Sequence, residues 1–327
     1  ITNDAYDTGA ENHEQQDDPD TSYTGAGEPP GVRAEGEFLA RRADAFRAYL
    51  EWMPIREPQT YQSEPHTGTQ FFRRFSFGDL AALSVVETRQ NRSQQVPTTA
   101  GGAPNPALAS PDRHLPEPAQ LTWLTAALTT SGPSWHLIGN QTVFTRVFTL
   151  PRAGATPGAI FNADQWDGYQ ADQTALLRAM GSSGSTDPVV LTGDIHSSWA
   201  ADLTPDPNNP NTATGGYDPV TGEGSLAVEF VGTSVSSPGV NDANGAIANS
   251  LKPANPHFKY INLNQRGYML IDADANRCVG EWWHIDTVAS LSNIETFAVA
   301  YEVRDGSNRL TPAVQTPSRL NPPLLAP

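Results

Sequence analysis

The apolar residues of this chain follow a helical pattern in three stretches. Within residues 37–52 they recur at the spacing of one face of an amphipathic helix, and Pro54 ends the pattern. Residues 119–128 and 164–180 are also predicted to be helical. The middle of the chain therefore contains helices separated by segments of a different pattern.

Short apolar runs bounded by turn residues predict strands in those other segments. Residues 70–77 and 80–87 meet at Gly78-Asp79, which predicts a hairpin. The alternation of helices and strands up to residue 192 is typical of α/β layers with functional loops at the strand ends. The strand-rich part after residue 225 is expected to form a second sheet. The other predicted strands are residues 135–138, 188–192, 226–231, 260–263, 268–271, 277–285 and 297–303.

Two segments rich in polar residues, Gly and Pro are predicted to be loops. Residues 1–36 contain many acidic residues and almost no aliphatic ones, a composition typical of loops or disorder. Residues 90–118 are rich in Pro, Gly, Asn and Ser, and are expected to form a long surface loop.

The charge of the chain excludes one class of partner. Its 327 residues include 20 basic and 36 acidic side chains, a formal net charge of −16. Phosphate backbones bind basic surfaces, so a nucleic-acid partner is not expected. No apolar run is long enough to span a membrane, and Cys278 has no partner for an internal disulfide. The chain starts at Ile1 without a signal-peptide pattern, so a processed or truncated product is expected.

Asp194 and His196 form the candidate site with the clearest geometry. They follow an apolar strand in the run Gly193-Asp194-Ile195-His196, and residues two apart on an extended segment point to the same side. A carboxylate and an imidazole at the carboxyl end of a strand can hold a metal cation. The alternative is a plain ion pair or a hydrogen-bonded turn, since short motifs match by chance.

Two further polar clusters precede that motif. Asn12-His13-Glu14 lies in the acidic N-terminal segment, where a solvated loop is the alternative to a site. Gly139-Asn140-Gln141 follows the strand predicted from Trp135. The remaining histidines are interpreted as structural or surface residues, except His257, which stays ambiguous.

In combination, these motifs resemble the order found in calcineurin-like metallophosphoesterases. The Asp at position 194, where that superfamily has His in its late motif, is similar to the alkaline phosphatase D (PhoD) family. This resemblance extends over nearly the whole chain. The residues that carry it are 49–56, 72–80, 87–92, 120–124, 138–141, 164–169, 190–199, 229–234 and 266–268.

The resemblance implies a fold and domain limits. The expected fold is α/β, a two-sheet α/β-β/α metallophosphoesterase sandwich whose N-terminal portion is missing from this chain. Residues 1–305 would form the C-terminal part of the domain, and residues 306–327 a C-terminal tail. The chain departs from the family at Glu11-Asn12-His13-Glu14, where Asp-Asp-His-Glu is usual, and at Gln173, where an Arg-type residue is usual. The superfamily's earlier motifs, including a bridging Asp, are absent before Asn12.

The resemblance also implies a metal centre of iron beside one or two calcium ions. Transferred residue by residue, His196 would ligate the iron, while Asp194 and Asn12 would ligate the neighbouring calcium, a cation that prefers oxygen ligands. Asn140 or Gln141 would complete the shell of the second metal.

The implied activity is hydrolysis of phosphate monoesters or diesters, as in alkaline phosphatases, phosphodiesterases and a secreted phospholipase D of the same family. His13 would be the catalytic residue, binding the phosphate or protonating the leaving oxygen. The expected partners are a small phosphate ester or a phospholipid, and an N-terminal fragment of the same protein. A secreted or extracytoplasmic bacterial location without integral membrane contact is implied.

Two other interpretations remain open from the sequence. The chain alone could be an inactive fragment that needs its N-terminal piece, because half of the expected metal ligands are missing. It could also be a non-catalytic module that binds phosphate or glycans.

Overall fold

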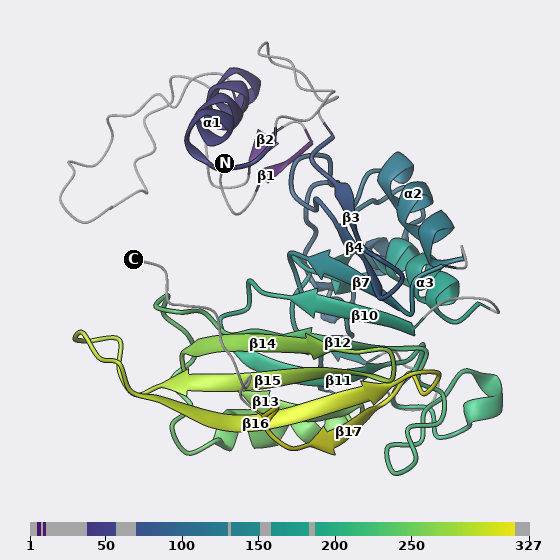
Figure 1. Ribbon diagram of the computed structural model, residues 1–327. Helices are drawn as coiled ribbons and strands as arrows, with labels where there is room; N and C mark the ends of the chain where they lie inside the picture. The colour runs from purple at the N-terminus through teal and green to yellow at the C-terminus, as the bar shows by residue number, and fades with distance from the viewer. Residues whose placement is uncertain are drawn as a thin grey trace.

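The computed structural model describes residues 5–7, 9–10, 38–56, 70–129, 132–150, 158–182 and 187–317 (Figure 1). Asn12 and His13 lie outside these described residues. The helices are α1 (Phe38–Trp52), α2 (Pro118–Leu128), α3 (Gln170–Met180) and α4 (Ala246–Leu251). Short 3-10 helices are η1 (Pro106–Ala109), η2 (Trp166–Gly168), η3 (Thr212–Thr214) and η4 (Lys252–Ala254). Three small strand pairs are β1 (Ala5–Tyr6) with β2 (Gly9–Ala10), β5 (Thr99–Ala100) with β6 (Ala103–Pro104), and β8 (Phe148–Leu150) with β9 (Ala159–Ile160).

A seven-stranded mixed sheet forms the centre of the fold, in the order β13-β11-β12-β10-β7-β4-β3. Its strands are β3 (Arg73–Phe77), β4 (Ala81–Val85), β7 (Trp135–Asn140), β10 (Asp187–Thr192), β11 (Ser198–Leu203), β12 (Ala227–Val231) and β13 (Phe258–Asn262). β3 and β4 pair antiparallel, which confirms the hairpin predicted at Gly78-Asp79. The neighbours β4, β7, β10 and β12 run parallel, so their carboxyl ends meet at one edge of the sheet.

A second sheet is antiparallel and has four strands. They are β14 (Gly267–Ala273), β15 (Arg277–Ile285), β16 (Glu295–Arg304) and β17 (Leu310–Ala313). The prediction that the second sheet starts after residue 225 is wrong, because β12 and β13 pair within the first sheet. At its other end the sheet extends into residues 306–327, where β17 pairs with β16.

The two sheets enclose a common apolar core. Phe230 on β12 packs against Trp282 on β15, with ring centroids 5.8 Å apart, and the Trp282 indole donates a hydrogen bond to the Val231 carbonyl at 2.8 Å. Gly280 is required at this contact, because a Cβ there would lie 2.9 Å from the Phe230 ring. The lone Cys278 is buried in the same core, where burial raises the pKa of its thiol to about 12. This cysteine is therefore a packing residue.

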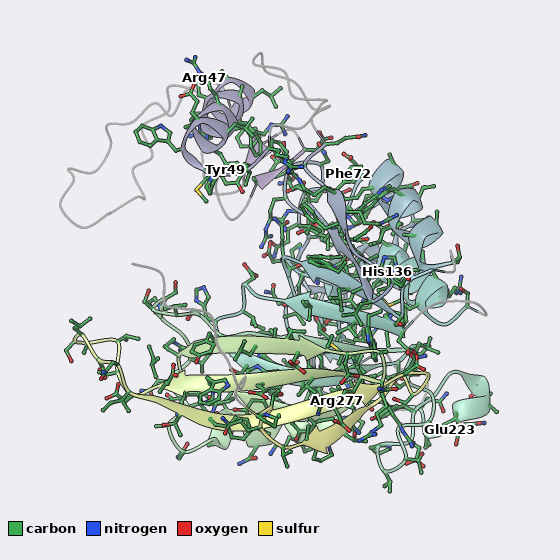
Figure 2. The ribbon with its side chains drawn as sticks, viewed as in Figure 1. Arg47, Tyr49, Phe72, His136, Glu223 and Arg277 are labelled. Carbon is green, nitrogen blue, oxygen red and sulfur yellow. The ribbon has the colours of Figure 1, made fainter. Side chains whose placement is uncertain are left out.

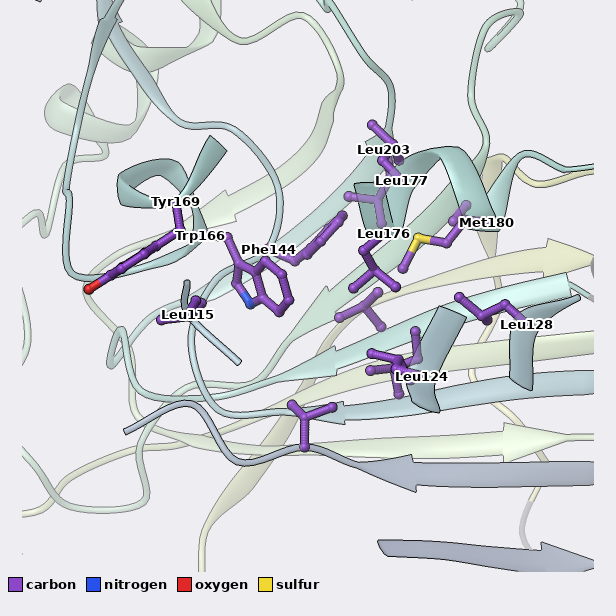
Figure 3. Close-up of a cluster of buried hydrophobic side chains, with 14 residues drawn as sticks. Leu115, Leu124, Leu128, Phe144, Trp166, Tyr169, Leu176, Leu177, Met180 and Leu203 are labelled. Carbon is purple, nitrogen blue, oxygen red and sulfur yellow. The ribbon is translucent and has the colours of Figure 1, made fainter. Parts of the chain in front are cut away.

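Helices α2 and α3 cover the opposite face of the seven-stranded sheet (Figures 1 and 3). Successive side chains of a strand point to opposite faces of the sheet. On β10, Val190 packs against the helices, whereas Val189 packs in the core between the two sheets. Trp166 and Phe144 pack edge to face at 5.0 Å in the helical cluster, as Figure 3 shows. Among the residues that the structure describes, no helix has the length and apolar character needed to cross a bilayer.

The described residues thus form three layers: helices, a mixed sheet and an antiparallel sheet. The outer face of the second sheet has no buried apolar cluster in the described part of the chain, and Leu270 there is 50% exposed. The mixed α/β architecture matches the expectation. The fourth layer of the sandwich stays a prediction.

Two local expectations need correction. The helix predicted over residues 164–180 is divided into η2 and α3 at Tyr169, whose ring is fully buried and whose hydroxyl donates to the Ser93 carbonyl at 2.7 Å. Residues 90–118 are irregular for much of their length, but they are not a simple surface loop. Leu108, Leu115 and Arg92 are almost fully buried, because this segment packs over the end of α3.

Replacing Trp282 tests the core between the sheets. We expect Trp282→Ala to lower the free energy of unfolding by about 3–5 kcal/mol, because it removes a fully buried aromatic side chain and leaves a cavity. Urea unfolding measures the change. The control is Val220→Ala, at a side chain that is 91% exposed, where a change within about 0.5 kcal/mol is expected. Equal effects of the two substitutions would contradict the packing of the sheets.

Candidate functional site

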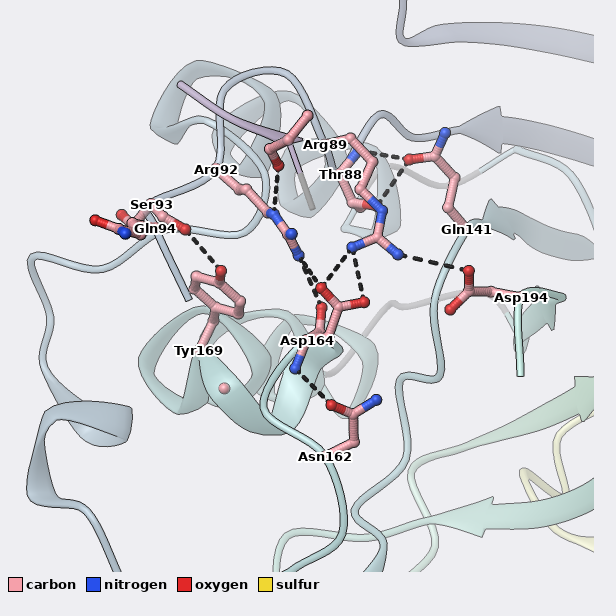
Figure 4. A network of polar contacts seen from close by, with 12 residues as sticks. Thr88, Arg89, Arg92, Ser93, Gln94, Gln141, Asn162, Asp164, Tyr169 and Asp194 are labelled. Atoms are coloured by element: carbon pink, nitrogen blue, oxygen red, sulfur yellow. Dashed lines mark hydrogen bonds and ion pairs between the residues drawn. The ribbon is translucent and has the colours of Figure 1, made fainter. Parts of the chain in front are cut away.

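Polar side chains gather where the parallel strands of the first sheet end. Arg89 follows β4, Gln141 follows β7, and Asp194 and His196 follow β10. Figure 4 shows Arg89, Gln141 and Asp194 facing one another across this edge. Ligand sites in open α/β sheets form at such carboxyl ends, so this edge is the candidate site.

Asp194 reaches the site from a strained turn. Its φ of 70° lies in the left-handed region, which L-residues other than Asn and Asp seldom adopt. Its side chain is 37% exposed, and Oδ1 lies 3.5 Å from Nη2 of Arg89. Partial burial raises the pKa of the Asp194 carboxyl above its usual value, and the charge of Arg89 opposes that rise. The arginine thereby favours the ionised form that a cation ligand needs.

Asp164 connects Arg89 to a second arginine (Figure 4). Nη1 of Arg89 donates to both carboxylate oxygens of Asp164, at 2.8 and 2.9 Å. Nη1 of Arg92 donates to Asp164 Oδ1 at 2.6 Å, and Nε of Arg92 donates to the Ala5 carbonyl at 2.8 Å. The backbone N–H of Asp7 in turn donates to the Arg92 carbonyl at 2.9 Å. These contacts hold the N-terminal β1–β2 pair next to the candidate site.

His196 is fixed at both its ring and its backbone. Its φ is 54°, and its ring atom Nδ1 lies 2.6 Å from the Pro238 carbonyl oxygen, to which it donates. Nη1 of Arg266 donates to the His196 carbonyl at 2.7 Å and to Thr233 Oγ1 at 3.1 Å. A Cβ at Gly239 would lie 1.7 Å from Nη2, so a side chain at this position would displace the guanidinium. With Nδ1 occupied, Nε2 is the ring atom of His196 that can bind a cation.

Asn140 and Gln141 both have their amide groups in hydrogen bonds. Asn140 is buried, accepts from the Trp166 indole at 3.1 Å, and donates to Thr192 Oγ1 at 3.2 Å. Gln141 Oε1 accepts two hydrogen bonds from Thr88, from its backbone N–H and from its hydroxyl, both at 2.7 Å. In this structure the two amides connect the end of β7 to its neighbours.

Two buried carboxyls hold the loop that follows β7. Glu229 on β12 accepts from the backbone N–H groups of Phe144 and Thr145, each at 2.8 Å, and from the Thr192 hydroxyl at 2.6 Å. Asp167 accepts from the Val147 N–H at 2.9 Å. Burial raises the pKa of Glu229 to about 7 and that of Asp167 to about 6. These two residues organise the strand ends and lie below the surface of the site.

The donor set in the described residues is incomplete. No group of three His, Cys, Asp or Glu side chains that could hold a metal occurs within the described ranges. The structure brings Asp194 and His196 to the same exposed edge, and it leaves Asn140 and Gln141 bonded to protein groups. The predicted ligand Asn12 and the predicted catalytic residue His13 lie outside the described residues, although β2 ends at Ala10.

The arginines are the site residues to which sequence reasoning assigned no role. Arg89, Arg92 and Arg266 occur in the motifs that carry the family resemblance, yet nothing local distinguished them from the other arginines. The available signal was position: Arg89 and Arg92 follow a predicted strand directly. Their partners Asp164 and His196 lie 70 or more residues away, so only the fold identifies them.

Comparisons with known proteins agree on a family. A family model described as PhoD-like phosphatase matches residues 1–282. Alkaline phosphatase D of Bacillus subtilis (strain 168) is 32% identical over 233 residues, which cover 71% of this chain and 36% of that protein. A solved structure described as "Structure of PhoD" matches with a TM-score of 0.71 and 28% identity, over 86% of this chain and 50% of the other. The chain therefore spans little more than a third of the first relative's length and half of the second's.

The raised pKa of Glu229 predicts a pH dependence of stability. A carboxyl that binds its proton more tightly in the folded protein stabilises the fold at low pH, and this stabilisation is lost between the unfolded pKa of 4.5 and the folded pKa of about 7. We expect Glu229→Gln to flatten the fall in unfolding free energy across this window. The variant also loses about 1–3 kcal/mol throughout, because its amide N–H faces a backbone N–H.

Unfolding by urea at several pH values measures both effects. The control is Glu51→Gln, at an exposed side chain on α1, which is expected to leave the slope unchanged. An unaltered slope in the Glu229 variant would contradict the prediction.

Proposed function

Because this chain belongs to the PhoD-like phosphatase family, we propose that it is a metal-dependent phosphoesterase that hydrolyses phosphate monoesters or diesters. The observation that carries this proposal is the pair Asp194 and His196. Both side chains are exposed at the carboxyl end of β10, and the histidine has its other ring nitrogen anchored on a carbonyl. That anchoring is the usual arrangement of a metal-binding histidine.

The donor chemistry fits the metals implied by the family. Carboxylate and amide oxygens suit calcium, which supports Asp194 and Asn12 as its ligands, and imidazole suits iron, which supports His196. Such cations, when bound, neutralise the charge of a phosphate ester and lower the pKa of a coordinated water. Of the two amides proposed for the second metal, Asn140 retains a lone pair on Oδ1, whereas Gln141 Oε1 already accepts two hydrogen bonds.

Several residues of this chain would position the proposed ligands and the substrate. The charge of Arg89 opposes the rise in the pKa of Asp194 and so favours its ionised form, and Asp164 fixes the position of Arg89. Arg266 fixes the backbone of His196. His13 would hydrogen-bond the phosphate or protonate the leaving oxygen. The anchoring of β1 and β2 to Arg92 supports this role, because the Asn12-His13 pair follows β2 closely in the sequence.

The natural ester and the location are finer proposals. A small phosphate ester is the proposed substrate, with a phospholipid as the alternative, and the proposed location is secreted or extracytoplasmic. Rates on a chromogenic phosphomonoester, the corresponding diester and phosphatidylcholine vesicles, with iron and calcium supplied, distinguish phosphatase, diesterase and phospholipase activity. Because the relatives are longer, a further portion of the same protein stays a proposed partner. If none of the three substrates were hydrolysed, the proposal that this chain is active on its own would be wrong.

Substitutions at the strand end test the metal site. We expect Asp194→Asn and His196→Ala each to abolish metal-dependent turnover and to lower bound metal, because each removes a ligand. Both side chains are exposed and lie outside the packed core, so the fold should stay intact. Hydrolysis rates, elemental analysis and urea unfolding are measured together.

The matched control for the carboxylate is Asp112→Asn, at an exposed aspartate in the segment before α2. It should keep the activity and metal content of the wild type. If Asp194→Asn or His196→Ala also kept both, the assignment of the site would be wrong.

His13→Ala tests the proposed catalytic residue. We expect kcat to fall by roughly 10²-fold or more, the scale of losing a general acid, while most bound metal is retained. Activity and metal stoichiometry are measured on the same sample. Loss of the metal together with activity would make His13 a ligand, and an unchanged kcat would return residues 12–14 to the interpretation of a solvated loop.

A further inference from the structure

An apolar cavity of about 850 Å³ lies next to the candidate site, between α1 and the β3–β4 hairpin. Phe46 and Tyr49 line it from α1, Phe71 and Phe75 line it from the hairpin side, and Val85 lies at the end of β4. Figure 2 shows Tyr49 on the lower side of α1 in that view. The volume is within the usual range of small-molecule pockets, which are mostly apolar with a few polar groups.

The aromatic side chains that line the cavity pack against one another and are still partly exposed to solvent. Phe46 and Phe71 stack with ring centroids 4.4 Å apart, which fixes the side of α1 that faces the hairpin. Tyr49 is 43% exposed and Phe75 is 46% exposed. Exposed aromatic groups that line one cavity are typical of a surface that binds an apolar ligand.

Two residues of the candidate site, Arg89 and Gln141, also line this cavity. Arg89 lines the cavity and also lies 3.5 Å from Asp194. Its neighbour Glu87 lines the cavity as well, but the Glu87 carboxylate accepts hydrogen bonds from the backbone of Arg89 and Gln90 and is committed to them. Arg73 and Arg89 are the other charged side chains that line the cavity, and Arg89 is itself held by Asp164 and Asp194. The rest of the lining is mostly apolar.

We propose that this cavity binds the apolar alcohol part, aryl or alkyl, of a phosphate ester whose phosphoryl group lies at Asp194 and His196. This inference rests on the proposed function and gives it a substrate class: esters of apolar alcohols or phenols. Sugar phosphates fit less well, because most of the lining is apolar and offers few hydrogen-bond partners to several hydroxyl groups.

The test compares phenyl phosphate with 4-tert-butylphenyl phosphate. The two phenols have nearly equal acidity, so a difference in kcat/KM reports how the enzyme binds the additional apolar group. We expect the wild type to favour the larger ester by about tenfold or more, the scale of added apolar contacts in a pocket. Phe75→Ala and Tyr49→Ala should each bring this ratio towards one, while turnover of phenyl phosphate changes less.

Phe77→Ala is the matched control. Phe77 lies on the same strand as Phe75, is 56% exposed, and does not line the cavity, so its removal should leave the ratio unchanged. A ratio near one in the wild type, or an equal effect of the Phe75 and Phe77 substitutions, would overturn the inference while the proposed function stands.

Calorimetry separates the two proposals if no ester is hydrolysed. Absence of turnover contradicts the proposed function, and the affinities for the two esters then test the cavity directly. Tighter binding of 4-tert-butylphenyl phosphate that is lost in Phe75→Ala, but kept in Phe77→Ala, would support the cavity. Equal affinities of the wild type for the two esters would overturn it.

Discussion

The candidate site depends on one carboxylate that two arginines share. Asp164 binds Arg89 through both of its oxygens and Arg92 through one, and both guanidinium groups are largely buried. Such hydrogen bonds between ionised groups are shorter and stronger than those between neutral groups. Through them the end of β4, the segment before α3 and the N-terminal strand β1 are held as one unit. Removing the shared carboxylate would take the nearest counter-charge from two largely buried cations, a costly change.

A second constraint acts on the other side of the site, where the backbone is strained. Asp194 and His196 both have positive φ angles, in a turn where Ile195 packs into a buried cluster. Such conformations persist when their surroundings determine them, and they are frequent at functional sites. Here Arg266 and the Pro238 carbonyl supply that support. The order of the site thus comes from long-range contacts with residues 233–266.

The sequence predicts elements with a clear local period and misses those whose polar residues have distant partners. Helix α1 and the β3–β4 hairpin were predictable because their apolar spacing and turn residues are local. Strand β11 was missed although it is buried throughout, because it contains Asp202. That carboxylate is satisfied by Tyr217 at 2.7 Å and by Lys259 at 3.3 Å, partners that the local pattern does not indicate.

The same distinction applies to the site and the sheets. The strand pattern predicts that Asp194 and His196 follow the end of a strand, but the expected period of two is wrong there, because both residues have positive φ in a turn and not an extended backbone. The roles of Arg89 and Arg266 depend on residues brought together by folding. Assigning β12 and β13 to a second sheet failed for a related reason. Strand patterns indicate burial and direction of side chains, but they do not indicate which edge a strand joins.

Arg89 couples the chemistry of the site to the selection of its ligand. Partial burial, and to a lesser extent the charge of Asp164, raise the pKa of Asp194, and the charge of Arg89, which contacts both carboxylates, opposes the rise. Nη1 of Arg89 donates to both oxygens of Asp164 at 2.8 and 2.9 Å, whereas Nη2 lies 3.5 Å from Oδ1 of Asp194. The contact with Asp194 is therefore the weaker one. Arg89 therefore opposes the rise in the pKa of Asp194 without abolishing it. Arg89 also lines the apolar cavity. A ligand held in that cavity would therefore contact the side chain that acts on Asp194, the proposed metal ligand.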